Sequence, residues 1–311
     1  MIYIGKTKYS IMVPVMSMFR GVYTVLVTPF NSKEEVDYEG LCEIARWQQK
    51  EGIHGIVVNG TTSEFLSLED DEKEKIAATV IKAVASKVPV IVGSSAEATR
   101  KTILYVKKAK ELGAQGVLIL PPYYFKPSQE EIFRHFTMIA DAVDIPIMIY
   151  NNPFTTGVDI KPETVKRLIE YHPNFSAIKD STGDIKRVRQ LCLLCGDKIK
   201  IFCGWEDLAY ESFLIGAEGW VSVISNIAPK LAVRLFEEVV EKKNYEEGWE
   251  IYKSMLPMLE LLEYGRKAPQ IVKYCLEKMG FCSSTVRAPR IPLNDEEKKK
   301  IDKLLKEIGV V

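Results

Sequence analysis

Short apolar runs rich in β-branched residues alternate with longer amphipathic segments from residue 21 to about residue 243. The runs predict strands at 22–27, 55–58, 88–92, 117–120, 145–150, 176–179, 199–203 and 220–223. Between them, the pattern predicts helices at 38–51, 70–86, 98–112, 128–142, from 162, at 184–194, at 206–215 and from 230. Since the runs are continuously apolar, they favour a parallel sheet buried on both faces.

Eight consecutive strand–helix units of this size predict a (β/α)8 TIM barrel. A doubly wound open sheet is the alternative, but no GxGxxG follows the first strand, which disfavours it. After residue 243 the pattern is helical only, at about 245–263, 266–279 and 294–308. We therefore expect an N-terminal extension (1–19), a barrel (20–243) and a C-terminal helical appendage (244–311).

The extension contains an apolar stretch, 11–19, that is too short to span a bilayer. Lys6 and Lys8 precede it, as in a signal peptide, but no small-residue cleavage site follows. We interpret residues 1–19 as a plain tail, with Met16 or Met18 as a possible start of translation. Attachment to a membrane through this tail is the alternative.

Composition excludes several classes of function. The chain has 42 Lys and Arg against 42 Asp and Glu, so no net charge favours nucleic acid or an anionic membrane. The six cysteines are scattered through a chain too large to need disulfides, which predicts reduced thiols and a cytoplasmic protein. With three isolated histidines and no carboxylate cluster at the strand ends, we expect no metal site.

In a TIM barrel, the chemistry lies at the C-terminal ends of the strands. Here these ends are rich in hydroxyl groups and carry one lysine. The residues are Thr28, Thr61, Thr62, Ser94, Ser95, Tyr123, Tyr124, Tyr150, Asn151, Lys179, Gly204 and Ser225. Lys179 ends the apolar run 176–179 and is followed by turn residues. An amine there can condense with a 2-oxo acid to give an iminium, which then acts as an electron sink.

Three neighbouring features would complete such a site. Backbone N–H groups of Gly60, Thr61 and Thr62, directly after a strand, can bind the carboxylate of the 2-oxo acid. Burial in a dry barrel favours the neutral amine of Lys179 that the attack requires. Tyr150, one strand–helix unit earlier, should neighbour Lys179 and pass protons through a threonine hydroxyl.

Several motifs together resemble the superfamily of dihydrodipicolinate synthase and N-acetylneuraminate lyase, over roughly residues 20–300. They are Gly60-Thr61-Thr62-Ser63-Glu64, Pro121-Pro122-Tyr123-Tyr124-Phe125-Lys126-Pro127-Ser128-Gln129, Tyr150-Asn151-Asn152-Pro153 with Gly157, Ile178-Lys179-Asp180-Ser181-Thr182-Gly183 and Gly204-Trp205-Glu206-Asp207. The resemblance implies a (β/α)8 barrel with C-terminal helices. It also implies a class I lyase that uses no cofactor beyond a covalent imine, and a homotetramer built as a dimer of dimers.

Roles for individual residues follow from the same resemblance. Lys179 matches the Schiff-base lysine, while Tyr150 and Thr61 match the residues of the proton relay. Thr62 matches the position whose amide binds the carboxylate, and Gly204 matches a glycine that lines the substrate cleft. Tyr124 matches a tyrosine that dihydrodipicolinate synthases lend across a dimer interface.

Two departures from the family concern the substrate. In dihydrodipicolinate synthases an arginine in the loop after the relay tyrosine holds the carboxylate of the aldehyde, and here that position is Thr155. A neutral hydroxyl does not replace a bidentate guanidinium. The positions that bind feedback lysine in regulated members are Phe65, Asp70, Lys73 and Glu97 here, which is unlike a typical regulated synthase.

N-acetylneuraminate lyase is a poorer match, because its GSTGE-type turn is replaced by 60–64. The loop from Tyr150 to Pro153 is closer to 2-keto-3-deoxy-sugar-acid dehydratases and to deaminases of a hydroxylated pyrroline carboxylate. We therefore predict a Schiff-base lyase that eliminates water or ammonia from a small-molecule 2-oxo acid of this kind. The alternatives are condensation of pyruvate with aspartate semialdehyde, a pyruvate-dependent aldol reaction, or a non-catalytic barrel that acts as a binding protein.

Overall fold

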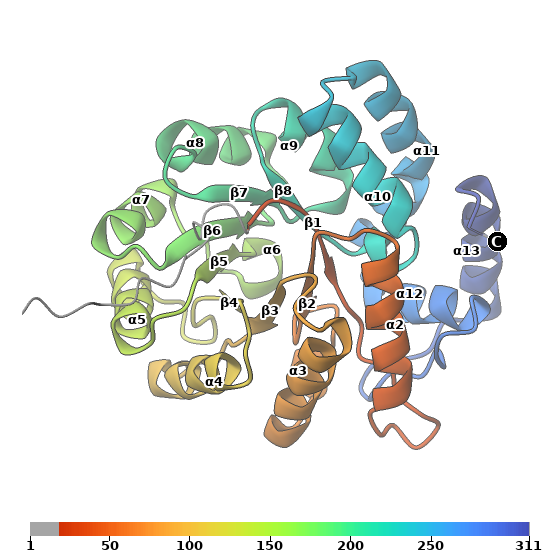
Figure 1. The fold of residues 1–311 in the computed structure, drawn as a ribbon, viewed down its shortest axis with the longest axis horizontal. Coiled ribbons are helices and arrows are strands. Elements are labelled where there is room, and N and C mark those ends of the chain that lie inside the picture. Colours follow the sequence, from red (N-terminus) through yellow and green to blue (C-terminus); the bar gives the residue numbers. More distant parts are fainter. Residues whose placement is uncertain (1–18, 311) are drawn as a thin grey trace, which may run out of the picture.

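The computed structural model describes residues 19–310 and shows eight parallel strands that close into a barrel in the order of the chain. The strands are β1 (Gly21–Val25), β2 (Gly55–Val58), β3 (Val90–Gly93), β4 (Gly116–Ile119), β5 (Ile147–Asn151), β6 (Phe175–Asp180), β7 (Lys200–Cys203) and β8 (Gly219–Ser222). Figure 1 shows the strands at the centre, with helices around them. The (β/α)8 prediction is confirmed, and the open-sheet alternative is wrong because β1 pairs with β8.

The barrel helices are α2 (Tyr38–Lys50), α3 (Asp70–Val84), α4 (Thr99–Glu111), α5 (Gln129–Ala142), α7 (Pro162–Tyr171), α8 (Ile185–Cys195), α9 (Ala209–Leu214) and α10 (Pro229–Phe236). Polar residues fix where several of them begin. Ser128 and Glu131 form a capping box at α5, and Glu69 and Glu72 form one at α3. The predicted boundaries therefore lie within a few residues of the observed ones.

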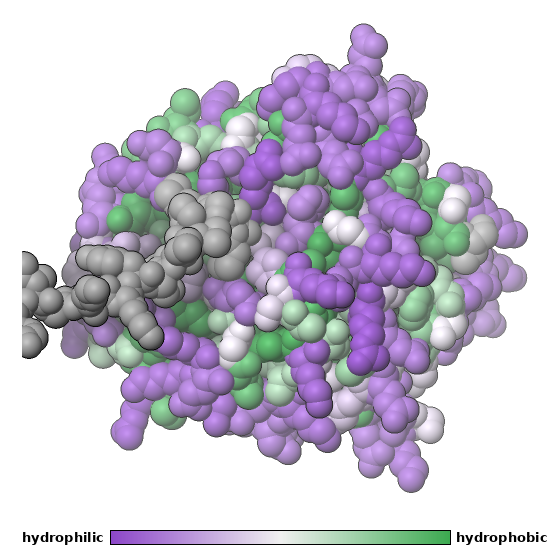
Figure 2. All heavy atoms as spheres, in the orientation of Figure 1, coloured by the Kyte–Doolittle hydropathy of each residue, from purple (hydrophilic) through white to green (hydrophobic). Residues whose placement is uncertain are grey.

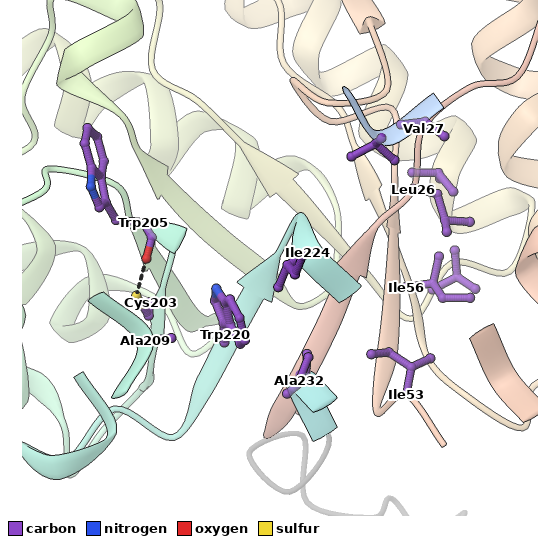
Figure 3. Close-up of a cluster of buried hydrophobic side chains, with 14 of the residues drawn as sticks. Leu26, Val27, Ile53, Ile56, Cys203, Trp205, Ala209, Trp220, Ile224 and Ala232 are labelled. Carbon is purple, nitrogen blue, oxygen red and sulfur yellow. Dashed lines mark hydrogen bonds between the residues drawn. The ribbon is translucent and has the colours of Figure 1, made fainter. Parts of the chain in front are cut away.

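Two apolar clusters hold these elements together. Inside the barrel, Tyr23 of β1 meets Phe202 of β7 edge to face, with ring centroids 5.3 Å apart. Between the strands and the outer helices lies the larger cluster, part of which Figure 3 shows around Trp220 and Ile56. Because each strand contributes side chains to both clusters, its residues are apolar on both faces, as the continuous runs predicted.

Three helices follow the barrel and gather on one side of it, as Figure 1 shows: α11 (Tyr245–Tyr264), α12 (Ala268–Lys278) and α13 (Asp295–Glu307). A buried ion pair ties α12 to the barrel, because Lys273 Nζ lies 2.5 Å from Glu64 Oε1 just after β2. This appendage therefore stands in a fixed place next to the C-terminal ends of the strands.

Figure 2 shows hydrophilic side chains over most of the visible face, with smaller hydrophobic areas between them. Within residues 19–310, no helix combines the length and apolarity needed to cross a bilayer. The predicted tail lies almost wholly outside the described residues; only Phe19, which packs inside the barrel, can be placed.

Short elements were missed by the sequence pattern. They are the 3-10 turns Phe65–Ser67 and Ile224–Asn226 and the one-turn helix α6 (Pro153–Thr156). The 3-10 turn Glu206–Leu208 and the π-helical turn Glu237–Glu241 fall within the helices predicted at 206–215 and from 230. Asn152 caps α6 by accepting a hydrogen bond from Thr155 N. A single turn that depends on one cap and one proline carries no hydrophobic periodicity, so it leaves no signal of the kind that predicts longer helices.

Candidate active site

A cavity of about 270 Å³ opens at the C-terminal ends of the strands, and Lys179 lies in it. Its lining residues come from both the barrel and the appendage: Thr61, Thr62, Tyr150, Asn152, Phe154, Thr155, Lys179, Ser181, Gly204, Trp205, Glu206, Val223, Leu262, Glu263, Arg266, Ala268, Pro269 and Arg290. The position agrees with the usual site of chemistry in this fold. Polar groups that converge in a cleft of this size make it the candidate active site.

Lys179 is held in the cavity by the pairing of its strand. It lies near the end of β6, opposite Tyr150 of β5 on one side and Phe202 of β7 on the other. The side chain is only 5% exposed, and its Nζ lies 4.2 Å from the centroid of the Tyr150 ring. The amine and the phenol that the sequence predicted as neighbours are therefore brought together.

The Tyr150 hydroxyl accepts a hydrogen bond from Asn152 Nδ2 at 2.9 Å. Because the same Asn152 side chain caps α6, the cap orients the phenol as well as the loop. Thr61 lines the same cavity as Tyr150, but within residues 19–310 no hydrogen bond joins their hydroxyls. The predicted relay thus has its two members in one cavity, with Asn152 as a positioning residue that the sequence analysis did not single out.

Several hydrogen bonds hold the turn after β2 in place. Ser63 Oγ accepts from Gly60 N at 3.1 Å and donates to Leu26 O at 2.5 Å. Thr28 Oγ1 donates to Ser63 O at 2.9 Å. These bonds fix a tight turn whose Thr61 and Thr62 face the cavity, as a carboxylate-binding turn requires.

Gly204 allows the backbone after β7 to approach the lysine closely. A Cβ at this position would lie 2.3 Å from Ser181 Oγ and 2.7 Å from Lys179 Cε. The Ser181 hydroxyl donates to Gly204 O at 2.7 Å. Any larger residue at 204 would displace the lysine, so the expected glycine of the cleft has a steric reason here.

Two carboxyl groups near the lysine have perturbed acidity. Burial raises the pKa of Glu206 to about 8, although hydrogen bonds from Ile224 N and Val223 N lower it. Burial likewise raises the pKa of Glu263 to about 7, and Lys179 partly offsets the rise. Glu263 Oε2 accepts from Glu206 N at 2.8 Å, so the two side chains share one region of the cavity.

The other predicted site residues lie as follows. Thr155 lines the cavity, whereas Gly60 borders a small void beside it. Ser225 is buried, and its hydroxyl donates to Ser222 O rather than facing the cavity. Tyr124 is 86% exposed and lies outside the cavity lining.

Two of the four positions matched to feedback lysine, Asp70 and Glu97, form contacts within the chain. Asp70 accepts from the Tyr105 hydroxyl at 2.5 Å and pairs with Lys101 at 3.1 Å. Glu97 accepts from the backbone N–H groups of Tyr123 and Tyr124. These carboxylates therefore already have partners within the chain.

Comparison with known proteins identifies the family. The model of the dihydrodipicolinate synthetase family matches residues 18–308. The chain belongs to this family. A 4-hydroxy-tetrahydrodipicolinate synthase of Geobacter metallireducens is 40% identical over 294 residues, covering 94% of this chain and all of that one. The one from Bartonella bacilliformis is 38% identical over 294 residues, covering 94% and 99%.

Solved structures of the family superimpose closely on this one. Dihydrodipicolinate synthase from Acinetobacter baumannii, in complex with pyruvate, gives a TM-score of 0.90 at 32% identity and covers 94% of this chain and 99% of that one. The prophage protein YagE of Escherichia coli, also in complex with pyruvate, gives 0.90 at 27% identity with the same coverage. With this family and its lysine in the cavity, the chain is a Schiff-base lyase of the dihydrodipicolinate synthetase family.

Proposed function

We propose that the chain condenses pyruvate with aspartate semialdehyde, as a 4-hydroxy-tetrahydrodipicolinate synthase. The observation that carries the proposal is the amine of Lys179, buried against the Tyr150 ring in a cavity that also contains the turn of Thr61 and Thr62. The relatives at 38–40% identity that bear this name support it. They favour this reaction over the elimination that the sequence analysis put first.

The chemistry follows from these groups. Lys179 Nζ adds to C2 of pyruvate and water leaves, giving an imine whose carboxylate is bound by the turn at Thr61 and Thr62. Loss of a proton from C3 gives an enamine, and Tyr150 is placed to carry that proton. C3 then bonds to the aldehyde carbon, whose oxygen is protonated. Attack of the substrate amine on C2 closes the ring and breaks the C2–Lys179 bond.

Elimination of water or ammonia from a five-carbon 2-oxo or imino acid is the second candidate. The observation that favours it is Thr155, which lines the cavity where an arginine would be expected to bind the carboxylate of the aldehyde. A substrate without a second carboxylate would need no arginine there.

The test compares the two reactions on one enzyme preparation. Borohydride trapping with pyruvate, followed by peptide mapping, should give a pyruvyl adduct on Lys179. Product analysis should then show condensation with aspartate semialdehyde and no turnover of 2-keto-3-deoxy-pentonate or 4-hydroxy-pyrroline-2-carboxylate. Turnover of a five-carbon acid without condensation would replace the first candidate with the second.

The assembly belongs to the same proposal. We take the protein to be a homotetramer in which Tyr124 reaches the site of a neighbouring subunit, and its 86% exposure in the single chain is compatible with that role. Sedimentation velocity would give the assembly. Tyr124→Phe would lower turnover without changing the assembly, whereas a monomeric wild type with full activity would refute this part.

A further inference from the structure

Two charged residues at the end of α11 line the cavity opposite the barrel strands. Glu263 lies in the last turn of α11 and Arg266 lies two residues beyond its end, and both side chains line the cavity. Neither residue is used by the imine chemistry described above. Both come from the appendage rather than from the strand ends that carry Lys179 and Tyr150.

Arg266 is an available cation at the rim of the cavity. Its guanidinium lies 5.6 Å from the centroid of the Phe154 ring, and within residues 19–310 no carboxylate pairs with it. Arg266 also has a φ of 55°, in the left-handed region that normally favours glycine just after a helix. The other arginine of the lining, Arg290, is already directed to Ser67 Oγ at 3.3 Å and Glu64 Oε2 at 3.6 Å.

Glu263 places a carboxyl group deeper in the same cavity, and an ammonium group bound beside it would favour the ionised form. One of its oxygens, Oε2, accepts from Glu206 N, while within the described residues its Oε1 receives no hydrogen bond. Its carboxyl group is close enough to Lys179 for the two charges to interact. A partly buried carboxylate with a free oxygen is stabilised when a cationic group of a ligand binds beside it.

We propose that Glu263 and Arg266 form the subsite that recognises the amino-acid end of the second substrate, Glu263 binding its ammonium group and Arg266 its carboxylate. The inference rests on the proposed condensation and names the groups that select its aldehyde. The groups that the cavity presents beyond Lys179 support it: a carboxyl group near the lysine and a guanidinium at the rim. An α-amino acid that carries an aldehyde presents an ammonium and a carboxylate together on one carbon, and these two groups complement that pair.

This subsite also resolves the departure at Thr155. A guanidinium just beyond the end of α11 supplies the bidentate partner that the loop after β5 lacks. A five-carbon acid with neutral hydroxyl groups at its far end would leave both charges without partners, and unpaired charges in a cleft disfavour such a ligand. The two charges therefore favour the zwitterionic aldehyde over the substrates of the elimination reaction.

The experiment measures binding on an enzyme that cannot turn over. Borohydride-trapped pyruvyl enzyme is titrated calorimetrically with four aldehydes: aspartate semialdehyde, succinate semialdehyde without the amine, 3-aminopropanal without the carboxylate, and butanal with neither. Steady-state KM and kcat with pyruvate and aspartate semialdehyde are measured in parallel. Failure of the proposed function would appear separately, as a wild type that forms the adduct but gives no condensation product.

The variants are Arg266→Gly, Glu263→Gln and the control Arg189→Ala, which removes an exposed cation from α8 on the outer ring. Arg266→Gly should lower the affinity for the two carboxylate-bearing aldehydes by roughly 10- to 100-fold, and the affinity for 3-aminopropanal should stay within about 2-fold of the wild-type value. Glu263→Gln should lower the affinity for aspartate semialdehyde and 3-aminopropanal by roughly 10-fold and leave the affinity for succinate semialdehyde unchanged. In turnover, both should raise KM for the aldehyde more than they lower kcat.

Glycine is the favoured residue at a φ of 55°, so Arg266→Gly should melt no lower than the wild type. A loss of affinity in that variant is then a loss of the guanidinium rather than of the fold. Unchanged binding of succinate semialdehyde to Arg266→Gly would overturn the proposal. An equal loss for all four aldehydes, butanal included, would do so as well, because it would indicate a change of cavity shape.

Discussion

Replacing Lys273 with methionine should cost far more stability than the loss of an ordinary surface lysine. Lys273 and Glu64 are both 0% exposed, and Lys273 Nζ donates to Glu64 Oε1 at 2.5 Å and to Thr285 O at 2.9 Å. The ammonium also lies 3.9 Å from the centroid of the Phe30 ring. Methionine fills a similar volume but removes the charge and both hydrogen bonds.

The size of the loss in stability follows from the Glu64 charge that stays buried in the variant. In Lys273→Met, Glu64 keeps Arg290 at 3.6 Å and the N–H of Arg287 at 3.3 Å, but loses its shortest contact. Breaking a buried ion pair by removing one partner costs about 3–5 kcal/mol, because the other charge is left uncompensated. A double variant, Lys273→Met with Glu64→Leu, leaves no such charge, so it should cost at least about 2 kcal/mol less than the sum of the single variants.

Equilibrium urea unfolding at one fixed protein concentration, followed by circular dichroism, measures these free energies. The matched control is Lys278→Met on the same helix, whose lysine forms a half-exposed pair with Asp302 at 3.3 Å. Its cost should stay below about 1 kcal/mol. If Lys273→Met cost no more than this control, or if the double variant were additive, the buried pair would not hold the appendage in the way described.

The remaining predictions concern the cavity. Lys179→Arg should keep the fold but form no borohydride-trapped adduct, and a retained adduct would mean that another residue is the nucleophile. Gly204→Ala should slow adduct formation by about 100-fold, since its Cβ would come within 2.7 Å of Lys179 Cε; a wild-type rate in a trapping time course would contradict this. Burial raises the pKa of Glu206 from its ordinary value of 4.5 to about 8, so the folded state holds this proton more tightly than the unfolded chain. The resulting stabilisation is complete below about pH 4.5 and is lost as the pH rises through 8, so Tm should fall between about pH 4.5 and pH 8, and Glu206→Gln should reduce that fall.

The barrel could be predicted because its strands are short, apolar on both faces and separated by capped helices. Lys179 and Tyr150 could be placed together because consecutive parallel strands of a barrel are neighbours, and the register does pair them. Gly204 was predicted from its motif, although the steric reason for a glycine there lies in contacts with Ser181 and Lys179 that the sequence does not show. These features could be predicted because each depends on residues within one or two neighbouring strand–helix units.

The rest of the site depends on contacts between distant segments. Glu263 meets the backbone of Glu206 across 57 positions, and nothing in the pattern of a C-terminal helix marks a residue that faces a cavity. Asn152 was read only as part of a motif, since its two roles as cap and partner of Tyr150 depend on the one-turn helix α6. Ser225 is the opposite case, because it was predicted from its position at a strand end but does not line the cavity. Its side chain is buried, and its hydroxyl donates a hydrogen bond to Ser222 O.

The cavity is thus built from two parts of the chain with separate tasks. The strand ends supply Lys179, Tyr150 and the turn at Thr61, groups that any 2-oxo acid needs because it always presents the same carboxylate and carbonyl. The last turn of α11 and the residues just after it supply Glu263 and Arg266, which meet only the second reactant under our proposal. A change in α11 can then alter the choice of aldehyde without moving the amine, whereas a change at Gly204 cannot. Under the same proposal, this separation accounts for a loop after β5 that carries Thr155 in a chain with the imine chemistry of its family.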